Sequence, residues 1–434
     1  MGLLIPSRST IPYTHKYLLM RTINLRYYDR EEIVRFLFMT GMFLSFLGSM
    51  SSPWLLWPLE DKFVLLASVC FIASALIGKM MADGLYTNKD FILPLLLYIS
   101  LYFYMIFAEH KNFNAYVISI FNIITVYFFL VVRREEIKKF CDLLAKFMGG
   151  FLIISIAYFV LYLIGIPLPS TNINYGTSYS FVNYYLFLLD DRTLFDIIPR
   201  FQSIFLEPGH LGTMCTMILF TQIGKWKQWY NISLIVAALI SFSLAAYGLL
   251  VPIIFLGMWV RGKQMFKKAL TAVVILAAIT AGSFIYKNGD NMLHNLIMLR
   301  LEVSDGKMAG DNRVTDDFMA DYESFLQSSD ILTGRDRNKE VFGNTGFRVF
   351  IYDYGLIGLV LLIVFYLTVM YEPRHKKAFI SVLIIATLNF IIRGNLLHFY
   401  IFITLYQVAQ NAFDLTPQEA QIGEKSADGL HLLN

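Results

Sequence analysis

Apolar runs of about 15 to 20 residues recur along almost the whole chain, separated mostly by short polar connections. Runs of this length match the thickness of a bilayer as α-helices. Membrane β-barrels instead show short segments of alternating polarity, which are absent from the sequence. We therefore predict an all-α polytopic membrane protein with about twelve spans. The predicted spans are 34–50, 62–82, 91–108, 115–132, 147–166, 205–223, 231–243, 246–260, 268–286, 349–370, 378–392 and 395–412.

The segment 231–260 allows two interpretations, one long tilted helix or a hairpin of two short crossings. Basic residues flank it on both sides, at Lys225 and Arg261, and clusters of Lys and Arg mark the cytoplasmic side of a membrane. A hairpin that turns near Ser243–Ala245 keeps both flanks inside, so we prefer it. The single helix would leave eleven spans.

Composition supports the membrane assignment, because 57% of the 434 residues are hydrophobic, 16% are charged and the mean hydropathy is +0.57. We divide the chain into a cytoplasmic N-terminal segment (1–33), a transmembrane domain (34–412) and a cytoplasmic tail (413–434). No small-residue cleavage site follows the first apolar run, which argues against a removable signal peptide. The location that fits is the inner (cytoplasmic) membrane of a bacterium, with both termini inside.

The cysteines, the histidines and the net charge give no indication of disulfides, a metal site or a nucleic-acid partner. The three cysteines fall in spans or on the inner side, so no external disulfide framework is implied. No Cys/His cluster has metal-site spacing, and we predict neither a metal nor a cofactor. The net charge of +4 reflects the inner loops and indicates no nucleic-acid partner.

Two long polar loops, 167–204 and 287–348, fall on the outer side. Within the second, apolar residues at helical spacing predict helices over 291–301 and 314–326. Positive residues outside run against the usual trend, and arginine suits bidentate phosphate recognition. The alternative is that these arginines pair with neighbouring carboxylates, which fits Arg335 and Arg337 best. The outer arginines are Arg192, Arg200, Arg300, Arg313, Arg335, Arg337, Arg348 and Arg393.

The segment R-F-Q-S-I-F-L-E-P-G-H-L-G, residues 200–212, places charge at the mouth of a predicted membrane helix. Pro208 suits the first turn of a helix, where its missing N–H has no partner to lose. The helix that follows is too short to cross the full apolar core, so its start lies below the outer surface. Glu207 would cap that start, and Arg200 lies upstream. The alternative is that Arg200 and Glu207 form a purely structural pair.

Two further residues near this segment are open to two interpretations. His210 fits a helix-face residue better than a catalyst. Arg393 is either a snorkelling residue at the outer interface or a side chain that faces the same site as Glu207.

Residues 200–212 resemble the Arg–Phe–Glu–Pro motif of bacterial O-antigen polymerases (Wzy-type) and their relatives in the O-antigen ligase superfamily. The resemblance continues in the same order along the chain. S-F-S-L-A-A-Y (241–247) is similar to a Ser-rich turn of the family, and G-D-N-R, which ends at Arg313, is similar to an element of its large periplasmic loop. D-I-L-T-G-R (330–335) is similar to the end of that loop, and V-F-I-Y-D-Y-G-L-I-G-L (349–359) is similar to the segment that re-enters the membrane. Ligases carry His-Asn before re-entry, whereas this chain has Asn344 without the histidine, which favours polymerase.

The resemblance implies a fold similar to C-type (GT-C) glycosyltransferases and a reaction at the periplasmic face. An acceptor sugar hydroxyl attacks the anomeric carbon of a glycan on undecaprenyl diphosphate, and the lipid diphosphate leaves. The lipid-linked oligosaccharide and the bilayer are then the partners. A polysaccharide chain-length regulator is a further candidate partner.

The implied site is built from positive charge, because the leaving group is a diphosphate. Arg200, Arg300, Arg313 and Arg393 would contact the diphosphate, with Glu207 and Arg313 as catalytic residues. Glu207 would either accept the hydroxyl proton or orient an arginine. Pro208, Gly209, His210 and Asn344 would support them.

Two other functions remain open. One is an O-antigen ligase that moves glycan to another acceptor. The other, from a different class, is a flippase for lipid-linked oligosaccharide, although a transporter is expected to place its charges along a central cavity and often has repeated halves.

Overall fold

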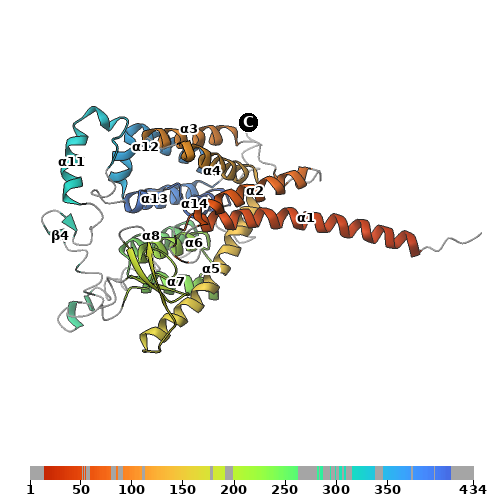
Figure 1. Ribbon diagram of the computed structural model, residues 1–434, viewed down its shortest axis with the longest axis horizontal. Coiled ribbons are helices and arrows are strands. Elements are labelled where there is room, and N and C mark those ends of the chain that lie inside the picture. Colours follow the sequence, from red (N-terminus) through yellow and green to blue (C-terminus); the bar gives the residue numbers. More distant parts are fainter. Residues whose placement is uncertain are drawn as a thin grey trace, which may run out of the picture.

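The computed structural model consists mainly of α-helices (Figure 1). It describes residues 14–50, 52, 54, 59–79, 85–86, 91–109, 113–175, 179–190, 199–261, 281–282, 284–286, 294, 299, 303–304, 307–308, 315–337, 346–372, 375–394 and 396–411. Within these ranges the helices are α1 (Thr14–Gly48), α2 (Glu60–Lys79), α3 (Ile92–Ala108), α4 (Phe113–Val131), α5 (Arg134–Leu163), α6 (Pro208–Thr221), α7 (Trp229–Ile240), α8 (Leu244–Arg261), α11 (Asp316–Leu326), α12 (Phe347–Met370), α13 (Lys376–Arg393) and α14 (Phe399–Asn411).

These helices overlap the predicted spans, apart from 268–286, most of which lies outside the described residues. The predominantly helical class is therefore confirmed. Two of the described helices, α5 and α12, are long and apolar enough to cross a membrane, and α3 and α7 are among several shorter apolar helices. Many large apolar side chains on the outside of the bundle are exposed, including Leu76, Phe107 and Val160.

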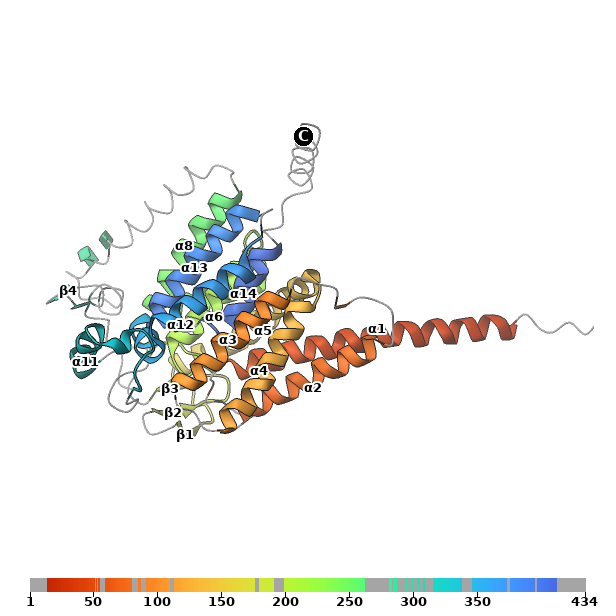
Figure 2. The same ribbon diagram turned by 90° about the horizontal axis from the view of Figure 1, so that it is seen from above.

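The helices form one bundle with α6 near its centre. Helix α6 packs against α7, α8 and α14, while α12 packs along α3 and α1 along α2. Nearly every residue of α6 from Gly209 to Phe220 is buried. Helix α1 extends well beyond the bundle at one end, and α11 lies at the opposite end in both views (Figures 1 and 2).

The chain turns between α7 and α8, as the hairpin interpretation of 231–260 predicts. Helix α7 ends at Ile240, α8 begins at Leu244, and Phe242 between them has a positive φ of 45°. The Tyr247 hydroxyl donates to the Leu239 carbonyl oxygen across the turn at 2.5 Å. The two segments are therefore separate helices.

A three-stranded antiparallel sheet occupies the first long loop, where the sequence predicted no strands. Its strands are β1 (Thr171–Tyr175), β2 (Tyr179–Asn183) and β3 (Leu188–Asp190), in the order β1-β2-β3. A second, two-stranded ribbon joins β4 (Val303–Ser304) and β5 (Lys307–Met308). The Leu188 N–H donates to the Ser203 carbonyl oxygen at 2.8 Å, so the larger sheet is attached to the chain just before α6.

The helix predicted over 314–326 is present as α11. Thr315 caps it through a hydrogen bond from the Phe318 N–H, at 3.2 Å. Its apolar face, with Phe318 and Phe325, packs against Tyr352 of α12 in a small core separate from the main one. The second predicted loop helix, 291–301, falls almost entirely outside the described residues.

Helix α12 is interrupted at Gly355, whose φ of 62° and ψ of −170° lie in a region that favours glycine. The chain from Leu332 to Arg335 supplies the missing hydrogen-bond partners. Ile357 N–H donates to the Leu332 carbonyl oxygen at 3.1 Å, and Arg335 N–H donates to the Tyr352 carbonyl oxygen at 2.7 Å. The segment Leu332–Arg335 is thus built into the break of α12.

Candidate functional site

The candidate site lies at the start of α6. Pro208 occupies the first turn and Glu207 the N-cap position, as expected. Glu207 is therefore the N-cap residue, but its side chain makes no capping hydrogen bond. Helix α6 has 14 residues. Its length is therefore about 21 Å at a rise of about 1.5 Å per residue, which is short of a bilayer core of about 30 Å. The Glu207 carboxylate is available for contacts other than capping.

Arg393 reaches this helix start from the end of α13. Its side chain is only 7% exposed, so the alternative of a snorkelling residue does not fit. Gly394 ends α13 in the left-handed conformation, with φ of 69°, and donates its N–H to the Phe390 carbonyl oxygen at 2.7 Å. A Cβ atom at Gly209 would overlap Nη2 of Arg393, so the missing side chain lets the guanidinium cross α6 in its present position.

The polar contacts of Arg393 are incomplete. Its Nη1 lies 3.7 Å from Oε2 of Glu207. This ion pair is too long for a hydrogen bond. Its Nε donates to Oγ1 of Thr213 at 3.4 Å, and its buried Nη2 has no hydrogen-bond partner among the described residues. A buried donor without a partner costs about 1–3 kcal/mol, more for a charged group.

Glu207 is held from a second direction. The Tyr179 hydroxyl, at the start of β2, donates to Oε1 of Glu207 at 2.9 Å. The carboxylate therefore lies between a phenol on one oxygen and a guanidinium on the other. With 38% of its side chain exposed, Glu207 marks the open side of the site, whereas Arg393 forms the buried side.

Arg200 contacts the turn at the end of α7, which packs on α6. Its Nε donates at 3.2 Å to the carbonyl oxygen of Ser241, the residue that caps the end of α7. A cation is favourable at a helix C-terminus. The Ser241 hydroxyl would lie 3.1 Å from a Cβ atom built at Gly212, so this turn packs closely on α6. The structure pairs Glu207 with Arg393, and the pair with Arg200 considered from the sequence stays a prediction.

The start of α6 combines a buried cation with the N-terminal end of a helix. Arg393 brings its guanidinium to Gly209 in the first turn of α6, and the N-terminal end of a helix adds partial positive charge. Glu207 supplies one negative charge. Such a site favours an anion with several acceptor oxygens.

The other predicted site residues are divided between this region and the undescribed segments. His210 lies in the first turn of α6, where its N–H donates to the Glu207 carbonyl oxygen at 3.0 Å. Its position agrees with that of a helix-face residue. Arg313, Arg300, Asn344 and Arg192 lie outside the described residues.

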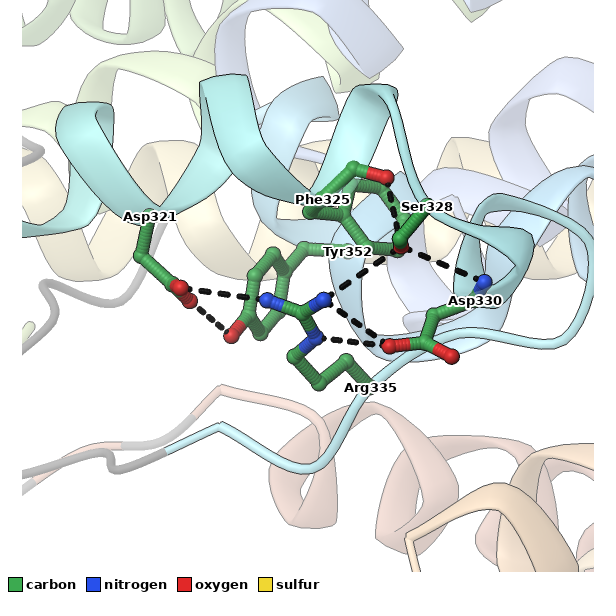
Figure 3. A network of polar contacts seen from close by, with 6 residues as sticks. All are labelled: Asp321, Phe325, Ser328, Asp330, Arg335 and Tyr352. Atoms are coloured by element: carbon green, nitrogen blue, oxygen red, sulfur yellow. Dashed lines mark hydrogen bonds and ion pairs between the residues drawn. The ribbon is translucent and has the colours of Figure 1, made fainter.

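Arg335 and Arg337, in the second long loop, form ion pairs, as expected from the sequence. Arg335 donates from Nε to Asp330 at 2.9 Å and from Nη1 to Asp321 at 3.1 Å (Figure 3). The hydrogen bond to Asp330 raises the pKa of the guanidinium. Arg337 is more buried than expected, at 6% exposure, and binds both oxygens of Asp353.

Sequence reasoning missed Tyr179, Thr213 and Ser243. Tyr179 comes from a loop with no recognisable motif, and Thr213 lies inside an apolar helix. Only Ser243 carried a signal, as part of the Ser-rich turn; its Oγ would lie 3.4 Å from a Cβ atom at Gly209. Within the described part of the chain, no group of three or more His, Cys, Asp or Glu residues is placed to hold a metal ion.

A scan against protein-family models, a search of curated proteins and a search of solved structures found no match to this chain.

Proposed function

We propose that the protein is a surface-polysaccharide polymerase of the O-antigen type, which joins repeat units carried on undecaprenyl diphosphate at the outer face of a bacterial inner membrane. The observation that carries the proposal is the buried, incompletely paired guanidinium of Arg393 beside the N-terminus of α6 and the Glu207 carboxylate. The motif order from Arg200 to Gly355 supports the same assignment.

The proposed topology has about twelve spans, with the start of α6, the sheet and α11 outside. Each inner basic cluster then lies in the cytoplasm. Ion pairs join helix ends on this side, including Arg134 with Glu372 at 2.6 Å and Lys225 with Asp142 at 3.2 Å. The start of α6 lies within the protein rather than against lipid, which is where irregular backbone is tolerated at membrane depth.

In the proposed reaction, a hydroxyl of the acceptor sugar attacks the anomeric carbon of the donor glycan. The bond from that carbon to the diphosphate oxygen breaks, the electron pair leaves with the diphosphate, and the hydroxyl proton passes to solvent. Arg393 donates its free N–H to a diphosphate oxygen, and this contact strengthens as negative charge develops. Glu207 orients Arg393, since both of its oxygens already face donors.

The test is deletion of the gene, complementation with the wild-type chain, and gel analysis of the lipid-linked and surface glycans. Loss of polymerase leaves single-repeat product. Long polymer that stays on the lipid would indicate a ligase instead, and repeat units retained on the cytoplasmic leaflet would indicate a flippase. Either of the last two results would overturn the proposal.

A further inference from the structure

Tyr179 lies in the antiparallel sheet of the first long loop. It begins β2 and lies opposite Tyr175 of β1, and β2 pairs in turn with β3. Its ring stacks on Phe181, with centroids 5.9 Å apart and an interplanar angle of 6°. Because Phe181 is fully buried, the sheet fixes the direction of the Tyr179 ring.

The sheet is connected to the chain that carries Glu207. Leu188 of β3 donates its N–H to the carbonyl oxygen of Ser203, and the Ser203 hydroxyl lies 3.0 Å from that of Ser155 on α5. Ser203 has a positive φ of 49°, a constrained conformation for a residue other than glycine. The hydrogen bond between Tyr179 and Glu207 therefore joins two segments that are themselves fixed in place.

The two oxygens of Glu207 are used differently. Oε1 accepts the Tyr179 hydroxyl at 2.9 Å, and Oε2 faces Nη1 of Arg393 at 3.7 Å. A hydrogen bond to one oxygen of a carboxylate sets the direction of the other. The direction of Oε2 in turn influences the position of the Arg393 guanidinium. Arg393 is otherwise held only weakly, because its hydrogen bond among the described residues is the 3.4 Å bond to Thr213.

We propose that Tyr179 is a positioning residue that acts through Glu207 on Arg393, and so sets the place of an anion bound at the start of α6. The inference rests on the proposed function for its substrate, a polyprenyl-linked diphosphate. The positioning role itself requires only that an anion with the geometry of a diphosphate binds at this site.

The test compares four purified, full-length proteins in detergent or nanodiscs: wild type, Tyr179→Phe, Glu207→Gln and the double variant. Tyr179→Phe keeps the ring on Phe181 and removes the hydroxyl. Tyr184→Phe is the matched control, because Tyr184 follows β2 and its ring packs on Phe187 and Tyr162. The readouts are kcat and KM with an undecaprenyl-diphosphate-linked repeat unit, and calorimetric binding of inorganic diphosphate.

We expect Tyr179→Phe to lower kcat about tenfold and to weaken diphosphate binding by a similar factor, as for one lost hydrogen bond to a charged group. KM should change less than kcat, and Tyr184→Phe should match wild type. The double variant should be no worse than Glu207→Gln alone, because the hydroxyl acts through that carboxylate.

Several outcomes would overturn the inference. One is a Tyr179→Phe variant with unchanged kcat and diphosphate affinity, and another is a variant with a lowered Tm but intact activity. A third is a double variant whose fold-loss in kcat equals the product of the losses in the two single variants. If the wild-type protein binds diphosphate more tightly than Tyr179→Phe but forms no polymer, the proposed function is contradicted and the positioning role of Tyr179 is retained. Wild-type protein that binds no diphosphate would overturn both.

Discussion

Two arginines with buried side chains, Arg337 and Arg393, have almost the same exposure and very different pairing. Arg337 is 6% exposed and binds both oxygens of Asp353, at 2.9 and 3.2 Å. Arg393 is 7% exposed, lies 3.7 Å from Glu207 and leaves Nη2 without a partner among the described residues. Burial alone therefore does not distinguish them.

The difference separates a structural charge from one that is available to a ligand. A fork-to-fork pair uses the donors of the guanidinium for a fixed partner, and Arg337 in this way ties the loop end to α12 beside Gly355. Arg393 keeps a donor in a place where water is largely excluded, and an electrostatic contact is stronger there than in bulk solvent. The under-paired arginine is the one to associate with chemistry.

The largest effect is expected on stability from Arg337→Ala. The change leaves the Asp353 carboxylate buried without its partner, a loss of about 3–5 kcal/mol when one member of a buried pair is removed. The measurement is the Tm and the membrane abundance of the protein. Replacing both partners, as in Arg337→Met with Asp353→Leu, should recover much of the loss; no recovery would show that the pair does more than hold the loop.

Arg393→Ala should instead remove activity while leaving the protein folded. Removing one donor to developing charge costs about 10²–10³-fold in kcat. The measurement is polymer formation in the deletion strain together with kcat of the purified variant. Arg134→Ala is the matched control, because that arginine pairs with Glu372 at the opposite end of the bundle. Normal polymer from Arg393→Ala would remove Arg393 from the site.

Gly209→Ala tests whether the position of Arg393 matters as well as its charge. The added methyl would displace Nη2, the mobile end of the side chain, so the fold should tolerate it. We expect a loss of about tenfold or more in kcat, because a small misplacement of a catalytic group is costly. Gly150→Ala is the control, since its nearest neighbour, Trp229, lies 3.8 Å from the new methyl. Equal kcat values for the two variants would contradict the assigned crossing.

The smallest effect is expected from Arg335→Ala. Its side chain is 28% exposed, so its pairs with Asp321 and Asp330 are partly screened by solvent. A stability loss of about 1 kcal/mol follows, with kcat unchanged. A thermal melt beside that of Arg337→Ala measures it, and a loss as large as for Arg337→Ala would show that the two networks are equally structural.

Most helices could be predicted from the sequence because they contain a long apolar run, α11 because its apolar residues recur at helical spacing, and the α7–α8 break because basic residues flank the pair. The sheet could not, since T-N-I-N-Y and Y-S-F-V-N are short and lie in a polar loop. The site was found only in part. Glu207 and Pro208 carry a local signal, but the approach of Arg393 and Tyr179 depends on helix packing and strand pairing that no local pattern encodes.

The break at Gly355 constrains how this chain can be exchanged with others. Leu332 and Arg335 provide backbone partners to α12, and the Tyr104 hydroxyl of α3 donates to the carbonyl oxygens of Thr333 and Tyr354 at 2.9 and 3.0 Å. A chimaera with a junction between Leu332 and Ile357 would separate these partners. Exchange of the loop before α12 between proteins must therefore carry the first turns of α12 with it, with the junction placed after Gly358.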